Sequence, residues 1–288
     1  MGRELGINAI AFQAFIVYCF HSFLIGNGLM QLNQEMEKVG NEMPIKYLGF
    51  TLLCSTVKIF LGSDSEDGSF NDNNIQGSAK QTSVYNFMLI LRACYFHEYD
   101  SAASLIQESK LIFKDYYVGT TNYAFFVFYS GLIAACMAKK QEESFYWLQI
   151  AKESMFLLKA WSVIVPENFQ NKLILLEAEI EVIDGNKDKA ETLFRESIIL
   201  SKKYRFVNEE ALANEKCAIF HADIGENHSA SNYFREALKL YSKWGATAKV
   251  QHIKSTYSTY LDDTNALDQF ETYELGSELS SILDMLTL

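Results

Sequence analysis

Apolar residues recur at spacings of three and four along most of the chain, and glycines or short polar clusters separate many of the apolar segments. This spacing places apolar side chains on one face of an α-helix, and no convincing alternation typical of a strand occurs. The sequence therefore predicts an all-α protein. The predicted helices span residues 7–26, 29–39, 43–61, 82–97, 100–117, 121–138, 142–162, 167–184, 187–204, 208–224, 227–243 and 246–260.

Two stretches of the chain follow one template of small and aromatic residues. A small residue is followed by glycine after seven positions, alanine after five, phenylalanine after four and a small residue after three. In tetratricopeptide repeats the small residues let two antiparallel helices approach, the glycine closes their turn and the phenylalanine fills space toward the next repeat. The two sets are Ala178, Gly185, Ala190, Phe194 and Ser197, and Ala218, Gly225, Ala230, Phe234 and Ala237.

Weaker copies of this template lie upstream, around Ala102 and Ser144. Their spacing is longer than the standard repeat of about 34 residues, so the helix pairs are expected to be irregular. A single helix pair cannot bury its apolar face, and neighbouring pairs must stack. The predicted fold is a right-handed tetratricopeptide-like α-solenoid of five or six helix pairs.

The polarity of the chain divides it into four predicted regions. Residues 1–62 are N-terminal helical repeats, and residues 63–81 are polar, acidic and glycine-containing, which is typical of a disordered loop. Residues 82–260 are the tetratricopeptide-like repeats. Residues 261–288 form an acidic linker followed by a short amphipathic helix, whose apolar stripe is Leu275, Leu279, Ile282, Leu283 and Leu286.

The charge and the cysteines limit the function classes. Twenty-five basic and 36 acidic residues give a net charge of −11, which argues against a broad nucleic-acid-binding surface. The five cysteines are far apart and form no CxxC motif, so we expect buried thiols in a reducing compartment, the cytoplasm. They are Cys19, Cys54, Cys94, Cys136 and Cys217.

One uncharged stretch, residues 9–25, leaves two interpretations open. It is nearly long enough to span a membrane, which needs roughly 20 mostly apolar residues, and Arg3 precedes it as in a signal peptide. Gln13 and His21 within the stretch favour a buried core helix instead. We expect the core helix and no membrane partner.

Chemistry-bearing motifs are scarce. Cys217 and His221 lie four residues apart on one predicted helix face, but no second pair accompanies them, so core filling is the expected role. The chain has no GxxxxGK[ST] phosphate loop and no HRD or DFG run. The sequence therefore predicts a non-enzymatic protein without catalytic, cofactor-binding or metal-binding residues.

Residues 209–250 resemble the closing repeats of the helical region that follows the predicted-ATPase domain in large hybrid sensor histidine kinases. The looser resemblance covers about residues 5–260. The best match is the segment around Trp244 and Gly245, which we expect to pack against the repeats. The matching residues are Ala211, Ala213, Asn214, Glu215, Gly225, Tyr233, Phe234, Glu236, Ala237, Tyr241, Trp244, Gly245, Ala246, Ala248, Lys249 and Val250.

That family carries an ATPase domain upstream, and a GAF sensor domain and a histidine-kinase core downstream. Their motifs have no counterpart here, so none of their functional residues is carried over. The resemblance implies a fragment, a split gene product or a degenerate paralogue of such a protein. Its function would be a regulatory or protein-interaction scaffold that contacts ATPase and sensor-kinase modules.

The repeat geometry offers one predicted binding surface. In tetratricopeptide stacks the first helix of each pair lines a concave groove, which can take a peptide or a partner helix. A free-standing adaptor that binds peptides there is the alternative function, and a membrane-tethered helical protein is a third. The predicted groove residues are Lys172, Leu175, Glu179, Leu212, Glu215 and Ile219.

Overall fold

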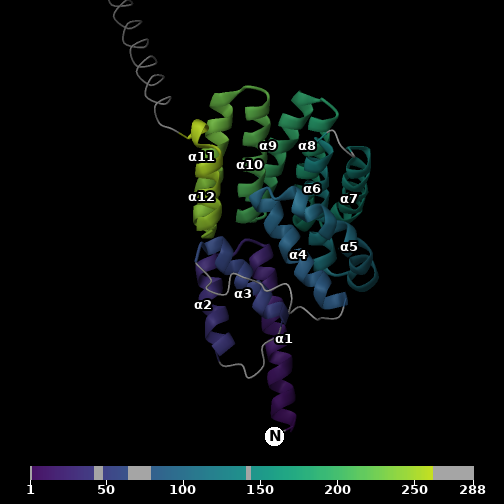
Figure 1. The fold of residues 1–288 in the computed structure, drawn as a ribbon, viewed down its shortest axis with the longest axis vertical. Coiled ribbons are helices and arrows are strands. Elements are labelled where there is room, and N and C mark those ends of the chain that lie inside the picture. Colours follow the sequence, from purple (N-terminus) through teal and green to yellow (C-terminus); the bar gives the residue numbers. More distant parts are fainter. Residues whose placement is uncertain (1, 42–47, 64–78, 141–143, 262–288) are drawn as a thin grey trace, which may run out of the picture.

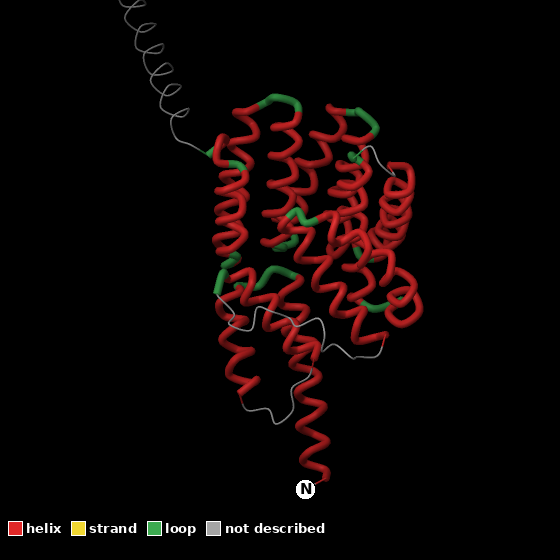
Figure 2. The backbone as a smooth tube through the Cα atoms, viewed as in Figure 1, coloured by secondary structure: helices red, strands yellow, loops and turns green. Residues whose placement is uncertain are grey.

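The structure is a computed structural model that describes residues 2–41, 48–63, 79–140 and 144–261. Over these residues the chain forms twelve α-helices and a short 3-10 helix, and no strand occurs in them (Figures 1 and 2). The helices are α1 (Gly2–Leu24), α2 (Leu29–Asn41), α3 (Leu48–Leu61), α4 (Ala79–Phe96), α5 (Tyr99–Tyr117), α6 (Thr121–Ala138), α7 (Ser144–Ile164), α8 (Pro166–Ile183), α9 (Lys187–Lys203), α10 (Val207–Asp223), α11 (Asn227–Trp244) and α12 (Thr247–Thr256), followed by η2 (Ser258–Tyr260).

The predicted all-α solenoid is confirmed. Helices α4 to α11 form four consecutive pairs that stack side by side, and α1 to α3 lie at one end of the stack (Figure 1). The predicted loop at 63–81 ends too late, because α4 already begins at Ala79. The rest of that loop and the acidic segment at 261–288 lie almost wholly outside the described residues and remain predictions.

The stack closes on itself at its C-terminal end. Helix α12 packs against α3 and α4, although these helices are far from it in the sequence. An aromatic cluster holds this closure: the Trp244 ring centroid lies 5.2 Å from that of Phe60 and 5.6 Å from those of Phe23 and Tyr95. The cluster joins α1, α3, α4 and α11 into one core.

The repeat template lies where the helix pairs pack. Gly185 and Gly225 close the α8–α9 and α10–α11 turns with φ values of +80° and +83°, a left-handed conformation that glycine adopts without a Cβ penalty. Gly245 ends α11 in the same way, with φ of +92°. The remaining template residues are buried: Ala178, Ala190, Phe194, Ser197, Ala218, Ala230, Phe234 and Ala237.

Helix α6 is, among the described helices, long and apolar enough to cross a bilayer, but 78% of that span is buried inside the protein, as in a core helix. The uncharged stretch at 9–25 lies mostly in α1, whose apolar part Ile10–Leu24 is shorter. This helix buries Phe12, Cys19 and Phe23 and exposes Ile10 and Val17.

Helix α6 lies close to α7 and α8 at Gly131. A Cβ atom added there would lie 2.7 Å from the Ser154 Cβ and 2.9 Å from Leu176 Cδ2. We expect Gly131→Ala to lower the free energy of unfolding by about 1–2 kcal/mol, because overpacking costs more than the gain in helix propensity. Urea denaturation followed by circular dichroism measures this change.

The matched control is Gly49→Ala in α3, where an added Cβ meets nothing within 4 Å. We expect no loss of stability there. Equal unfolding curves for the two variants would contradict the close approach of α6 to α7.

Candidate functional site

The predicted groove residues lie on the inward faces of α8 and α10, but that face is filled. Lys172, Leu175, Glu179, Leu212 and Glu215 are buried, and only Ile219 is half-buried. Side chains of α4, α6 and α12 cover them, because the solenoid closes across its own inner side. Over the described residues, these positions line a packed interior in place of an open groove.

An ionic network runs through this interior. Its first part joins α8 and α10, where the Lys172 Nζ lies 2.7 Å from a Glu209 carboxylate oxygen, with both side chains buried. The same ammonium lies 4.2 Å from the Phe206 ring centroid. Asn171 also donates a hydrogen bond to Glu209. The lysine is therefore held by charge and by aromatic faces together.

The second part of the network surrounds Glu179 of α8. Its two carboxylate oxygens lie 2.6 Å from Lys139 Nζ and 3.5 Å from Lys216 Nζ. Burial alone would raise the pKa of Glu179, but the two ammonium groups outweigh it and hold the pKa below its usual range. Lys216 also donates to the Tyr99 hydroxyl, 3.0 Å away. Helices α5, α6, α8 and α10 are thereby joined.

The third part centres on Glu215 of α10. Lys249 of α12 donates to it over 2.6 Å, the Tyr241 hydroxyl over 2.7 Å, and the His97 Nε2 lies 3.0 Å away. Burial would raise the pKa of Glu215, but Lys249 and His97 hold it well below its usual range. His97 reaches this position from the α4–α5 turn, where it takes a φ of 62°.

The carboxylates of the interior network, Glu179, Glu209 and Glu215, are buried, and Lys139 and His97 are its partly exposed members. In the described part of the chain no three His, Cys, Asp or Glu side chains gather as a metal site would require. Cys217 and His221 both lie buried in α10, and the His221 Nδ1 is 2.7 Å from Glu226. Their surroundings suit core packing.

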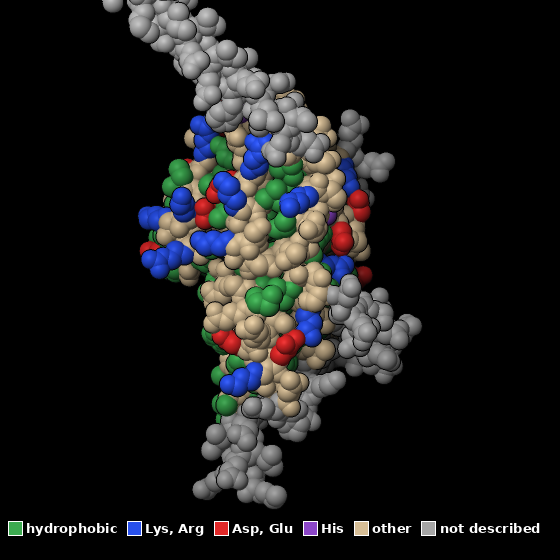
Figure 3. Space-filling view, turned by 90° about the vertical axis from the view of Figure 1, so that its left-hand side faces the viewer, with side chains coloured by type: hydrophobic (Ala, Val, Ile, Leu, Met, Phe, Trp, Pro, Cys, Tyr) green, Lys and Arg blue, Asp and Glu red, His purple; other side chains and the backbone are tan. Residues whose placement is uncertain are grey.

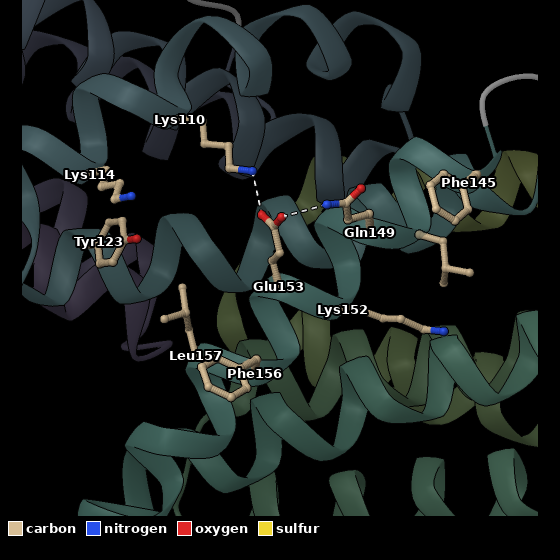
Figure 4. Close-up of a pocket in the computed structure, with 10 residues that line it drawn as sticks. Lys110, Lys114, Tyr123, Phe145, Gln149, Lys152, Glu153, Phe156 and Leu157 are labelled. Atoms are coloured by element: carbon tan, nitrogen blue, oxygen red, sulfur yellow. Dashed lines mark hydrogen bonds and ion pairs between the residues drawn. The ribbon is translucent and has the colours of Figure 1, made fainter.

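An open groove lies instead on the outside of the molecule, between α5, α6 and α7 (Figure 4). We call it the outer groove. It has a volume of about 650 Å³, and Phe145, Leu148, Phe156 and Leu157 of α7 supply most of its apolar lining, with Tyr123 of α6. Phe145 is 82% exposed and Phe156 is 71% exposed.

Helix α7 has two different faces. The buried face carries Trp147, Ile150, Ala151, Ser154 and Leu158, the ordinary spacing of a core helix. The open face carries Phe145, Gln149, Lys152 and Phe156, which are spaced i, i+4, i+7 and i+11. Side chains at this spacing line up along one side of a helix over three turns. This second stripe is apolar at both ends and faces the outer groove.

The outer groove is basic although the protein is acidic. Lys110 and Lys114 of α5 and Lys152 of α7 line it, against the single carboxylate of Glu153. Glu153 is already occupied, because Lys110 Nζ lies 2.7 Å from it and Gln149 donates to it, as Figure 4 shows. Among the described residues, Lys114 and Lys152 form no ion pair.

The face of the molecule that includes α11 and α12 carries side chains of both charges. Figure 3 shows the side of the molecule that includes α11 and α12, where Lys and Arg side chains gather over the upper half with acidic side chains among them. Lys239 and Glu236 of α11, for example, form an exposed ion pair of 3.1 Å. The outer groove differs from this face by its exposed phenylalanines.

Sequence reasoning did not single out the outer groove. The available signal was the pair Phe145 and Phe156, which lie off the buried stripe of their helix. Seven aromatic residues lie between positions 116 and 129. Tyr123 lines the groove, Tyr116 is exposed, and the other five are buried: Tyr117, Phe125, Phe126, Phe128 and Tyr129.

Comparison with known proteins gives one family. The model described as "CHK1-like, TPR repeats" matches residues 32–263. No curated protein and no solved structure gives a significant match to the chain.

Proposed function

Because the chain belongs to the family of CHK1-like TPR repeats, we propose that it is a non-enzymatic scaffold whose outer groove binds a helix of a partner protein. Tetratricopeptide repeats generally act in protein–protein interaction, since stacked helix pairs present long continuous surfaces. In this proposal the chain acts in the cytoplasm, as a regulatory region for ATPase and sensor-kinase modules of a signalling protein.

The exposure of Phe145 and Phe156 in one groove is the observation that carries the proposal. Burying one such side chain is worth about 1.5–3 kcal/mol, so leaving two exposed in one groove is costly unless a partner covers them. Contiguous exposed apolar surface of this kind marks interaction sites. A helix fits because the groove runs between α5 and α7 and presents its two exposed phenylalanines at helical spacing.

Coupling is the mechanism that this arrangement favours. The interior ionic network and the aromatic cluster around Trp244 join helices from both ends of the chain. Because the helices are joined in this way, binding at one surface can shift modules attached at another surface with little deformation of the repeats between them. The adaptor alternative needs the same outer groove and differs only in having no attached modules.

A photo-crosslinking amino acid at position 149 tests the proposal, since Gln149 lies between the two phenylalanines on the open face of α7. Introduced as p-benzoylphenylalanine in the native host cells, it is expected to capture a protein other than this chain. Phe156→Glu should reduce that capture about tenfold, because a contact worth 1.5–3 kcal/mol is lost. Mass spectrometry of the adduct identifies the captured protein and the linked peptide.

Ile199 of α9 provides the matched control, because it is an apolar residue 65% exposed outside the groove. The same crosslinker at position 199 should not give the adduct, and Ile199→Glu should leave capture at position 149 unchanged. Absence of any foreign protein at position 149, or equal capture at both positions, would contradict the proposed function.

A further inference from the structure

The acidic C-terminal segment of the chain has the chemistry that the outer groove requires. Residues 262–288 contain seven Asp and Glu residues and no Lys, Arg or His. The groove presents three lysines, of which Lys114 and Lys152 form no ion pair among the described residues. We infer that this segment docks as an amphipathic helix in the outer groove and competes there with the partner helix.

The apolar stripe of the segment has the same length as the open face of α7, which is apolar at its two ends. In the segment Leu275, Leu279, Ile282 and Leu286 are spaced i, i+4, i+7 and i+11. The open face of α7 carries its lining residues at the same intervals, between Phe145 and Phe156. At about 1.5 Å of rise per residue both stripes extend over roughly 16 Å, so a docked helix buries both phenylalanines.

Three acidic residues lie along one side of the apolar stripe when the segment is helical. They are Glu271, Glu274 and Glu278. Lys114 on α5 and Lys152 on α7 are available to carboxylates of a helix laid between these two helices, whereas Lys110 is paired with Glu153. Opposite charges at the rim set the orientation and the selectivity of such a helix.

Thirteen residues connect Leu261, where described structure ends, to Leu275. Extended, they reach about 45 Å at roughly 3.5 Å per residue, more than twice the radius of gyration of about 19 Å expected for a compact chain of this length. Docking within one chain and docking into a second copy both use the same contacts.

This inference rests on the proposed function, because it takes the outer groove to be a helix-binding surface and adds its regulation. While the segment is docked, a partner helix must displace it. A module that engages the segment therefore frees the groove, which links the C-terminal side of the chain to partner binding.

Zero-length crosslinking of the full-length protein tests the docking. A water-soluble carbodiimide activates a carboxylate, a nearby lysine amine displaces the activated group to form an amide, and the reagent leaves as its urea. We expect amide links from Lys114 or Lys152 to Glu271, Glu274 or Glu278, identified by mass spectrometry of the digest. Mixing ¹⁴N- and ¹⁵N-labelled protein tells links within a chain from links between two copies.

The variants use exposed positions so that the fold is kept, which a thermal melt of each verifies. Phe156→Glu and Leu279→Glu should each reduce the yield of these links about tenfold, through loss of one buried apolar contact. Ile199→Glu should leave it unchanged. The ion pair between Lys140 and Asp100, 2.6 Å apart and exposed, should crosslink equally in every sample and serves as the internal standard.

Recovery of the Lys140–Asp100 link, with no link from the groove lysines to residues 262–288, would overturn the docking. A foreign protein captured at position 149 in that case leaves the proposed function standing. Conversely, links from the segment, combined with no foreign capture at position 149 even in Leu279→Glu, would support the docking and overturn the proposed function.

Discussion

Replacing Lys249 by methionine is expected to lower the free energy of unfolding by about 3–5 kcal/mol, because it leaves a buried carboxylate without its main counter-charge. Lys249 and Glu215 are both fully buried and lie 2.6 Å apart. After the change, Glu215 keeps only the Tyr241 hydroxyl and the His97 ring as partners. Urea denaturation monitored by far-ultraviolet circular dichroism measures the loss.

Lys140→Met is the matched control for this change. Lys140 also lies 2.6 Å from its partner, Asp100, but the two side chains are 50% and 75% exposed. Exposed pairs contribute about 0.2–1 kcal/mol, so the control should be nearly neutral. The double variant Lys249→Met with Glu215→Leu should recover part of the loss, since no unpaired carboxylate remains. Equal effects of Lys249→Met and Lys140→Met would show that Glu215 has access to water.

The helices could be predicted from the sequence, and so could the face of each helix that points inward, because the small-residue template marks both. Ala178 and Ala218 mark where the first helix of each pair meets the second, which places Lys172 and Glu215 on the inner side. The template has no information on whether that side stays open. Closure depends on pairs such as Lys249 with the Tyr95 carbonyl, 154 residues apart, and local periodicity does not report such contacts.

The end of the last repeat shows the same limit on a smaller scale. The sequence predicts one helix over residues 246–260, but α12 ends at Thr256 and a 3-10 turn follows at Ser258–Tyr260. Tyr257 leaves the helical conformation, and its ring stacks on Phe234 at a centroid distance of 4.3 Å. Helix α12 therefore ends where Tyr257 contacts α11, whereas hydrophobic spacing alone predicts that the helix continues.

One side of the outer groove, the open face of α7, could have been predicted from the sequence. An amphipathic core helix has one apolar stripe, and a second stripe at Phe145 and Phe156 is a signal of binding. The periodicity of α7 does not show that α5 forms the opposite side of the groove. Lys110 and Lys114 meet α7 only because the repeats stack α5 beside it, so the basic character of the groove emerges with the fold.

Ala230→Glu is expected to unfold the C-terminal repeats, because Ala230 is fully buried on α11, a helix that packs on α10, and a carboxylate there would lose its hydration. An unpaired buried charge costs several kcal/mol, a large share of the roughly 5–15 kcal/mol that stabilises a domain. Since repeats depend on their neighbours, loss of α10 and α11 should also free α12 and open the interior around Glu215. Hydrogen exchange of these helices and a thermal melt measure both effects. Asn232→Glu, exposed on the same helix, should leave them unchanged. A melt of Ala230→Glu that matches this control would show that α11 does not pack on α10 through Ala230.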